Sequence, residues 1–239
     1  MEDHKVLIIS DSRGAGLQEA IDSQPSSNNI IWTVKYLPGA NLNTISRRLT
    51  RIHKQYDVII VIAGICNFTT KVRRSNRNSI EYPSRQKDNT IAEIETLLDR
   101  FAEKIHICTI TPADLLKRQD PNSTATEEDQ INLVQDIEDT NRHIIERNIS
   151  RDFPTIDIAR NSYSTSLKQQ GPKKKRTSKF NSKDLPDGIH PNEKLKQDWA
   201  RYITEKTPSI ITKLTEKQQE QEDESTDSDS DNTWNFKRK

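Results

Sequence analysis

The sequence predicts an α/β protein built on a parallel sheet whose two faces are covered by helices. Two observations lead to this fold class. Short runs of apolar, β-branched residues recur along the chain, and amphipathic helical patterns separate them. Within these runs the hydrophobicity is nearly continuous, which is typical of strands buried on both faces. Strands that alternate with helices favour parallel order, so we expect a five-stranded parallel sheet.

The predicted strands end at turn-forming residues such as proline, glycine or aspartate. Residues 57–64 (DVIIVIAG) are the clearest buried strand of the chain. The segment FPTIDIA supplies a short last strand. The five predicted strands are residues 5–10, 29–36, 57–64, 105–112 and 153–159.

The segments between the strands have helical periodicity. In residues 41–56 apolar side chains recur at every third or fourth position, and Asn41 or Asn43 is available as the N-cap. A closing segment supplies one or two further helices. The predicted helices are residues 14–21, 41–56, 90–104, 127–149 and 193–214.

Composition separates this core from two charged segments. Of the 239 residues, 31% are hydrophobic and 31% charged, and the formal net charge is only +1. Residues 164–183 nevertheless hold seven Lys and Arg and no acid, whereas residues 220–231 hold seven acids and no base. Neither segment has enough apolar surface to offset the entropy of ordering it. We therefore expect one domain over residues 1–210, with a flexible basic insertion at 164–183, and a disordered acidic tail over 211–239.

The cysteines and the apolar runs restrict the class of protein. Cys66 and Cys108 lie far apart and no C-x-x-C spacing exists, so we expect two small buried hydrophobes and neither a disulfide nor a metal site. The first residues do not resemble a signal peptide, and no apolar run approaches the ~20 residues of a membrane span. These features favour an intracellular protein that is not secreted.

Polar residues follow the ends of the predicted strands, where open α/β sheets place their reactive groups. Ser12 follows the first strand, Gly39 the second and Asn67 the third, while Asp187 and His190 lie late in the chain. A serine hydroxyl becomes a nucleophile when an imidazole accepts its proton, and a carboxylate can orient that imidazole. The backbone amides of Ser12 and Gly39 and the side-chain amide of Asn67 can serve as donors to an oxyanion.

Each of these residues also has a purely structural interpretation. Ser12 can cap the helix that follows it. Asp187 and Gly188 can form an ordinary turn, and His190, which precedes Pro191, can simply begin a helix. The residue pattern alone leaves both sets of roles open.

In order and type, these residues resemble the motifs of the SGNH (GDSL-like) hydrolases. Asp11-Ser12 matches the first block, Gly39 the second, Gly64 to Asn67 the third and Asp187 to His190 the last. The resemblance implies a three-layer, flavodoxin-like fold and a serine esterase that uses no cofactor or metal and hydrolyses a small acyl or acetyl ester. Two positions depart from the family pattern.

The departures are Ser10, where the family has glycine, and Phe68, where it has an aspartate thought to steady the oxyanion loop. Ser10 is small enough to be tolerated, whereas Phe68 bears on the efficiency of the site. Domains of this family also occur in proteins of retrotransposons and of some viruses.

The basic residues suggest further partners. Lys173, Lys174, Lys175 and Arg176 resemble a nuclear-localisation signal, which implies a nuclear import receptor and a nuclear or nucleo-cytoplasmic location. Lys71, Arg73, Arg74 and Arg77 follow Asn67 and can form a rim for an anion or RNA. The alternative to an esterase is therefore a catalytically idle SGNH-like module that binds RNA or a protein through its basic loops.

Overall fold

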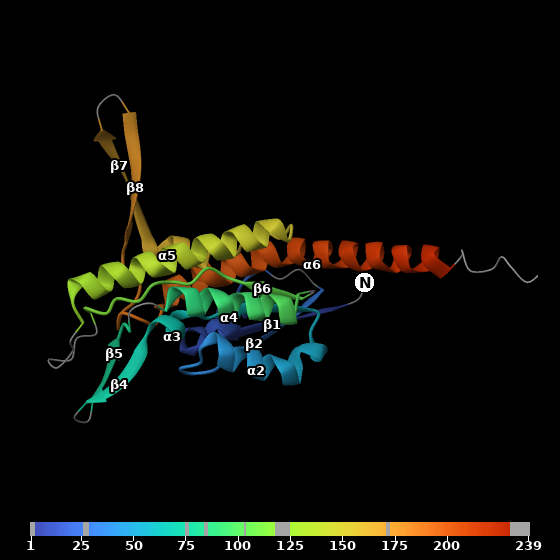
Figure 1. The fold of residues 1–239 in the computed structure, drawn as a ribbon, viewed down its shortest axis with the longest axis horizontal. Helices are drawn as coiled ribbons and strands as arrows, with labels where there is room; N and C mark the ends of the chain where they lie inside the picture. The colour runs from blue at the N-terminus through green and yellow to red at the C-terminus, as the bar shows by residue number, and fades with distance from the viewer. Residues whose placement is uncertain are drawn as a thin grey trace, which may run out of the picture.

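The computed structural model describes residues 3–25, 29–74, 77–83, 86–102, 104–117, 125–170 and 173–229. Its centre is a sheet of four parallel strands in the order β2-β1-β3-β6. These strands are β1 (His4–Ser10), β2 (Ile30–Tyr36), β3 (Val58–Ile62) and β6 (Ile105–Ile107) (Figure 1). The structure thus confirms the α/β class and the parallel sheet.

The register of the sheet brings three strand ends together. Ser10, the last residue of β1, lies opposite Tyr36 at the end of β2 and opposite Ile62 at the end of β3. Because the strands are parallel, the loops that leave them meet at one edge of the sheet. The candidate residues Ser12, Gly39 and Asn67 follow these three ends.

Helices cover both faces of the sheet because alternate residues of each strand point to opposite sides. Leu7 and Ile9 pack into one core with α2 (Leu42–Ile52), α4 (Lys87–Arg100) and α5 (Glu127–Ser150). Val6 and Ile8 pack into a second core with α1 (Leu17–Asp22) and α6 (Glu193–Asp229). All four side chains are fully buried, as the continuous apolar run predicts.

Capping residues set the helix starts. Of the two predicted candidates, Asn41 caps α2, and its side chain accepts the backbone N–H of Thr44 at 2.9 Å. Thr126 and Asp129 form a capping box at the start of α5. These caps satisfy backbone N–H groups that a helix leaves without an internal partner.

The prediction of a fifth strand at residues 153–159 is wrong. This segment runs beside the end of β6, and the N–H of Thr109 donates to the carbonyl of Ile156 at 3.3 Å, but no ladder forms. Pro154 has no N–H to donate, and the segment turns into the 3₁₀ helix η3 (Ile158–Ser162). The sheet that the structure describes has four strands.

Two β-hairpins replace segments for which irregular loops were expected. The first is β4 (Thr70–Arg74) with β5 (Arg77–Glu81), and the second is β7 (Tyr163–Gln170) with β8 (Lys173–Phe180). The second hairpin occupies most of the insertion predicted to be flexible. Its strands satisfy each other's backbone groups, and the rings of Tyr163 and Phe180 meet at its base with centroids 6.1 Å apart. The flexibility expected of residues 164–183 stays a prediction.

Helix α6 continues through residues 211–229 of the acidic segment. Residues 230–239 lie outside the described part of the structure, and the disorder expected of the tail stays a prediction. Lysine, glutamine and glutamate dominate residues 213–222, and all three have high helix propensity. Within the described ranges, no helix is both long and apolar enough to cross a membrane.

Candidate active site

Ser12 lies on a tight turn directly after β1. This turn is the 3₁₀ helix η1 (Ser12–Gly14), and Asp11 caps it by accepting the N–H of Arg13 at 2.9 Å. The cap is therefore Asp11, and the interpretation of Ser12 as a capping residue is wrong. The hydroxyl of Ser12 contacts His190 instead.

His190 and Asp187 lie on the loop that precedes α6 and reaches back to this turn. The Nε2 atom of His190 lies 3.0 Å from Ser12 Oγ, and its Nδ1 atom lies 2.7 Å from Asp187 Oδ2. A carboxylate only accepts, so Nδ1 carries the proton and Nε2 is left to accept the serine proton. The three side chains form one continuous hydrogen-bonded chain.

The other oxygen of Asp187 holds the loop in place. Its Oδ1 atom accepts the N–H groups of Ile189 at 3.0 Å and His190 at 2.8 Å, and Gly188 takes a positive φ of 82° between them. The predicted Asp187-Gly188 turn is thus present and serves to aim the imidazole. Partial burial acts to raise the pKa of Asp187, but the hydrogen bonds from His190 and Ile189 outweigh it and hold this pKa at about 2. Asp187 is ionised at neutral pH.

Two backbone N–H groups at this edge are candidates for binding an oxyanion. Among the described residues, the N–H groups of Ser12 and Gly39 have no hydrogen-bond partner. Gly39 has a φ of +73°, a conformation that residues with a Cβ rarely adopt, and it is exposed. Both groups remain available to a ligand.

The third candidate, Asn67, lies on the short helix α3 (Ile65–Phe68), and two contacts fix its amide. Its Oδ1 atom accepts the N–H of Leu42 at 3.0 Å, and its Nδ2 atom donates to Glu93 Oε2 at 2.7 Å. Glu93 also accepts the N–H of Asn43 at 3.2 Å. An amide nitrogen carries two hydrogens, so the second one is available to a substrate.

Glu93 is the functional candidate that the sequence reasoning missed. It lies on α4, in an amphipathic pattern that marks it only as a polar position. Its carboxylate contacts the Asn67 amide, whereas the SGNH resemblance implies an aspartate directly after the asparagine. Phe68 occupies that position here and is fully buried in the core.

The second departure from the family pattern, Ser10, is also accommodated. Its side chain is buried, and its hydroxyl donates to the carbonyl of Ile62 at 2.8 Å. This bond joins the ends of β1 and β3 beneath the nucleophile turn. The extra hydroxyl therefore has a partner.

Gly64 shows why the segment that carries Asn67 begins with glycine. Its φ is +126°, and a Cβ at this position would lie 2.5 Å from Cδ1 of Ile110. Both the backbone conformation and the space exclude a side chain. Glycine is required for α3 to leave β3 at this angle.

A buried cation lies directly behind Ser12. The guanidinium of Arg13 donates to the carbonyl of Thr111, while its Nε and Nη2 atoms and the Oδ2 atom of Asp11 are buried without a partner among the described residues. Burial lowers the pKa of Arg13 and raises that of Asp11, and the attraction between the two charges opposes both shifts. This pair places charge beneath the turn that carries the nucleophile.

The two cysteines are free thiols. Burial raises the pKa of Cys66 to about 11, and it also raises the pKa of the fully buried Cys108. Neither side chain is poised for thiolate chemistry.

The predicted basic clusters lie on the two hairpins. Lys71, Arg73 and Arg74 fall on β4, Arg77 falls on β5, and the segment Lys173 to Arg176 falls on β8. The side chains of all these residues lie outside the described part of the structure. Their roles as an anion rim and as a nuclear-localisation signal stay predictions.

The chain is similar to known proteins in its fold but not in its sequence. No family model matches the chain, and no curated protein matches it. Several solved structures do match the fold of the chain. A lipase/acylhydrolase from Enterococcus faecalis is 14% identical with a TM-score of 0.58, and the match covers 84% of this chain and 94% of that one. A member of the lipolytic protein G-D-S-L family from Veillonella parvula is 13% identical with a TM-score of 0.54, over 84% of this chain and 96% of that one.

A third similar structure is Axe2, an acetylxylan esterase from Geobacillus stearothermophilus. It is 11% identical with a TM-score of 0.52, and the match covers 88% of this chain and 94% of that one. The chain therefore has the fold of the SGNH/GDSL acylhydrolases and acetyl xylan esterases. At these identities the likeness concerns the fold alone.

Proposed function

We propose that this protein is a serine esterase of the SGNH type that hydrolyses a small acyl or acetyl ester. One observation carries the proposal: the chain of hydrogen bonds from Ser12 through His190 to Asp187, at the edge where the strand ends meet. The fold shared with acylhydrolases and acetyl xylan esterases supports the same class of substrate.

In the proposed reaction Ser12 Oγ attacks the acyl carbon while its proton passes to His190 Nε2. Asp187 stabilises the imidazolium that forms. The negative charge moves to the former carbonyl oxygen, which accepts hydrogen bonds from the N–H groups of Ser12 and Gly39 and from the amide of Asn67.

The intermediate then collapses. The ester C–O bond breaks, and His190 returns the proton to the departing alkoxide, which leaves as the alcohol. Water then attacks the acyl-Ser12 ester by the same route, with His190 as the base, and releases the acid and free Ser12. The residues of this chain balance every proton in both halves of the reaction.

The openness of the site favours a short acyl group. The side chains of His190 and Asp187 are 42% and 44% exposed. A long acyl chain needs an apolar cleft to bind, whereas these two polar side chains lie open to solvent. An acetyl ester fits such an open site.

Hydrolysis of p-nitrophenyl acetate tests the proposal. The wild-type protein should release p-nitrophenol, and Ser12→Ala should lose this activity with an unchanged circular-dichroism spectrum. Asn67→Ala should lower kcat by roughly 100- to 1,000-fold, the range for one oxyanion donor. Equal turnover by Ser12→Ala and wild type would overturn the esterase assignment.

A further inference from the structure

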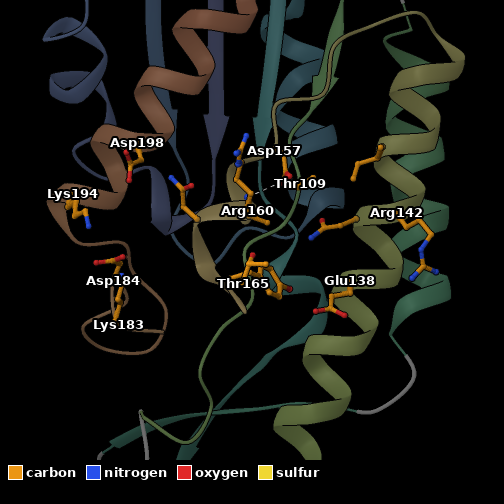
Figure 2. Close-up of a pocket in the computed structure, with 15 residues that line it drawn as sticks. Thr109, Glu138, Arg142, Asp157, Arg160, Thr165, Lys183, Asp184, Lys194 and Asp198 are labelled. Carbon is orange, nitrogen blue, oxygen red and sulfur yellow. Dashed lines mark hydrogen bonds between the residues drawn. The ribbon is translucent and has the colours of Figure 1, made fainter. Parts of the chain in front are cut away.

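A pocket of about 730 Å³ opens between α5, α6 and the start of β7, and Ser12 is not among the residues that line it (Figure 2). Four acidic residues line it, Glu138, Asp157, Asp184 and Asp198. Four basic residues line it as well, Arg142, Arg160, Lys183 and Lys194. The pocket is therefore polar but has no net charge, and it favours a neutral group with several hydrogen-bond donors and acceptors over an anion.

The basic hairpin rises from the rim of this pocket. Tyr163 and Thr165 line the pocket and also belong to β7, and the hairpin extends from there away from the body of the protein (Figure 1). Its sequence holds six basic residues and no acid: Lys168, Lys173, Lys174, Lys175, Arg176 and Lys179. The hairpin, whose sequence is strongly basic, thus adjoins a polar pocket without net charge.

The hairpin lacks a counter-charge of its own. Its register places Lys168 directly opposite Lys175. Like charges opposite each other destabilise a pair of strands, and an isolated two-stranded hairpin is marginally stable at best. An anionic partner would therefore stabilise the ribbon.

The acid-rich part of α6 lies far along the helix from the hairpin. The helix begins at Glu193, beside the loop of His190, and runs to Asp229 at the opposite end of the molecule (Figure 1). At ~1.5 Å per residue, the acid-rich part from Glu220 onward starts about 40 Å from the beginning of the helix. The backbone of the hairpin and that of the acid-rich part of α6 therefore lie toward opposite ends of the molecule (Figure 1).

The hairpin β4–β5 leaves the same end of the sheet as β7–β8 (Figure 1). Its sequence holds Lys71, Arg73, Arg74 and Arg77 against a single acid, Glu81. The strand ends that carry Ser12 and Asn67 lie at this end of the sheet too. Two cationic arms therefore leave the edge of the candidate active site.

We propose that the β7–β8 hairpin and the pocket at its base bind single-stranded nucleic acid, with the phosphates on the hairpin and a base in the pocket. Single-stranded nucleic acid alternates anionic phosphates with neutral polar bases. This pattern matches a cationic hairpin beside a pocket without net charge. An acidic peptide would instead bring further carboxylates to a pocket whose four basic residues are already balanced by four acidic ones. A duplex would keep its bases out of reach. This binding is independent of the proposed esterase activity.

Fluorescence anisotropy with a labelled single-stranded RNA, titrated at several salt concentrations, tests the hairpin. In a variant with Lys173, Lys174, Lys175 and Arg176 all changed to serine, binding should weaken. The slope of log K against log salt should become shallower by about 3, since each phosphate contact on a single strand contributes ~0.7. A matched control changes Arg47, Arg48 and Arg51, exposed on α2, to glutamine and should leave the slope unchanged.

A second variant tests the pocket. Glu138→Ala should weaken binding up to about tenfold and alter the preference among uridine, cytidine and adenosine oligomers. It should not change the salt slope, because Glu138 contacts no phosphate in this arrangement. Circular-dichroism spectra that match the wild type report that both proteins remain folded.

Three results would overturn the proposal. The first is an equal loss of binding in the α2 control and the hairpin variant. The second is binding of duplex as tight as that of single strand, with no effect of Glu138→Ala. The third, read by analytical ultracentrifugation without RNA, is a dimer abolished both by the hairpin variant and by deletion of residues 216–239. That dimer would show that the hairpin binds the acidic helix of a second copy.

Discussion

Removal of the Glu93 carboxylate should lower kcat without unfolding the protein. The amide of Asn67 is held by two bonds, one from the N–H of Leu42 at 3.0 Å and one to Glu93 at 2.7 Å. The bond to Glu93 is charge-assisted and is the stronger of the two. In Glu93→Ala the Leu42 contact alone holds the amide, so its free hydrogen is less well aimed at the oxyanion.

The size of this effect is bounded by the loss of the whole donor. Removing an oxyanion donor costs roughly 100- to 1,000-fold in kcat. Misaiming the Asn67 amide forfeits part of that, so we expect about a tenfold loss in Glu93→Ala, or ~1.4 kcal/mol. Glu93→Gln keeps an acceptor and should lose about threefold or less. KM should hardly change, because the interaction forms with the oxyanion and not with the ground-state ester.

Steady-state kinetics with p-nitrophenyl acetate measure these losses. Asp99→Asn, at an exposed carboxylate further along α4, is the matched control and should retain full kcat. In an Asn67→Ala background, Glu93→Ala should have almost no further effect, because both changes act through one amide. Full kcat in Glu93→Ala, or an equal loss in both backgrounds, would refute the role of Glu93.

Three further predictions concern stability. Hydrogen bonds hold the pKa of Asp187 at about 2, below its ordinary 3.8. The contribution of Asp187 to stability is therefore present above pH 3.8 and is lost as the pH falls to 2. The urea midpoints of wild type and Asp187→Asn should converge over this range. Arg13→Met leaves the buried Asp11 carboxyl without its cation. It should lower the free energy of unfolding, measured by chemical denaturation, by about 3 kcal/mol. A loss below about 1 kcal/mol would show that the two charges do not interact. Gly64→Ala forces a Cβ against Ile110 at an unfavourable φ. It should lower the free energy of unfolding by about 2 kcal/mol and should also lower kcat. A crystal structure of the variant with an unmoved Ile110 would contradict this.

The sequence identified the residues of the candidate site because their positions depend on strand ends. A buried strand is recognisable from its hydrophobicity, and the loop after it must lie at the carboxyl edge of a parallel sheet. Ser12, Gly39 and Asn67 could therefore be assigned to one edge from the amino-acid pattern alone. Glu93 could not, because its contact with Asn67 depends on how α4 packs beside α3, which no local pattern encodes.

The remaining differences have equally local causes. The segment with Pro154 has the apolar content of a strand, but strand formation also needs a partner ladder, which this segment does not complete beside β6. The basic insertion and the acidic tail were judged by their lack of apolar residues. Such a criterion does not consider the backbone pairing that forms β7–β8 or the helix propensity of residues 213–222 in α6.

Covalent labelling of Ser12 tests the central claim most directly. A fluorophosphonate reacts with a serine only when a neighbouring base activates its hydroxyl, so the reaction reports on the Ser12–His190 contact itself. Intact-mass measurement and peptide mapping should find one adduct, on Ser12, with labelling absent in Ser12→Ala and much slower in His190→Ala. No adduct on the folded wild-type protein, or labelling that persists in Ser12→Ala, would contradict the account.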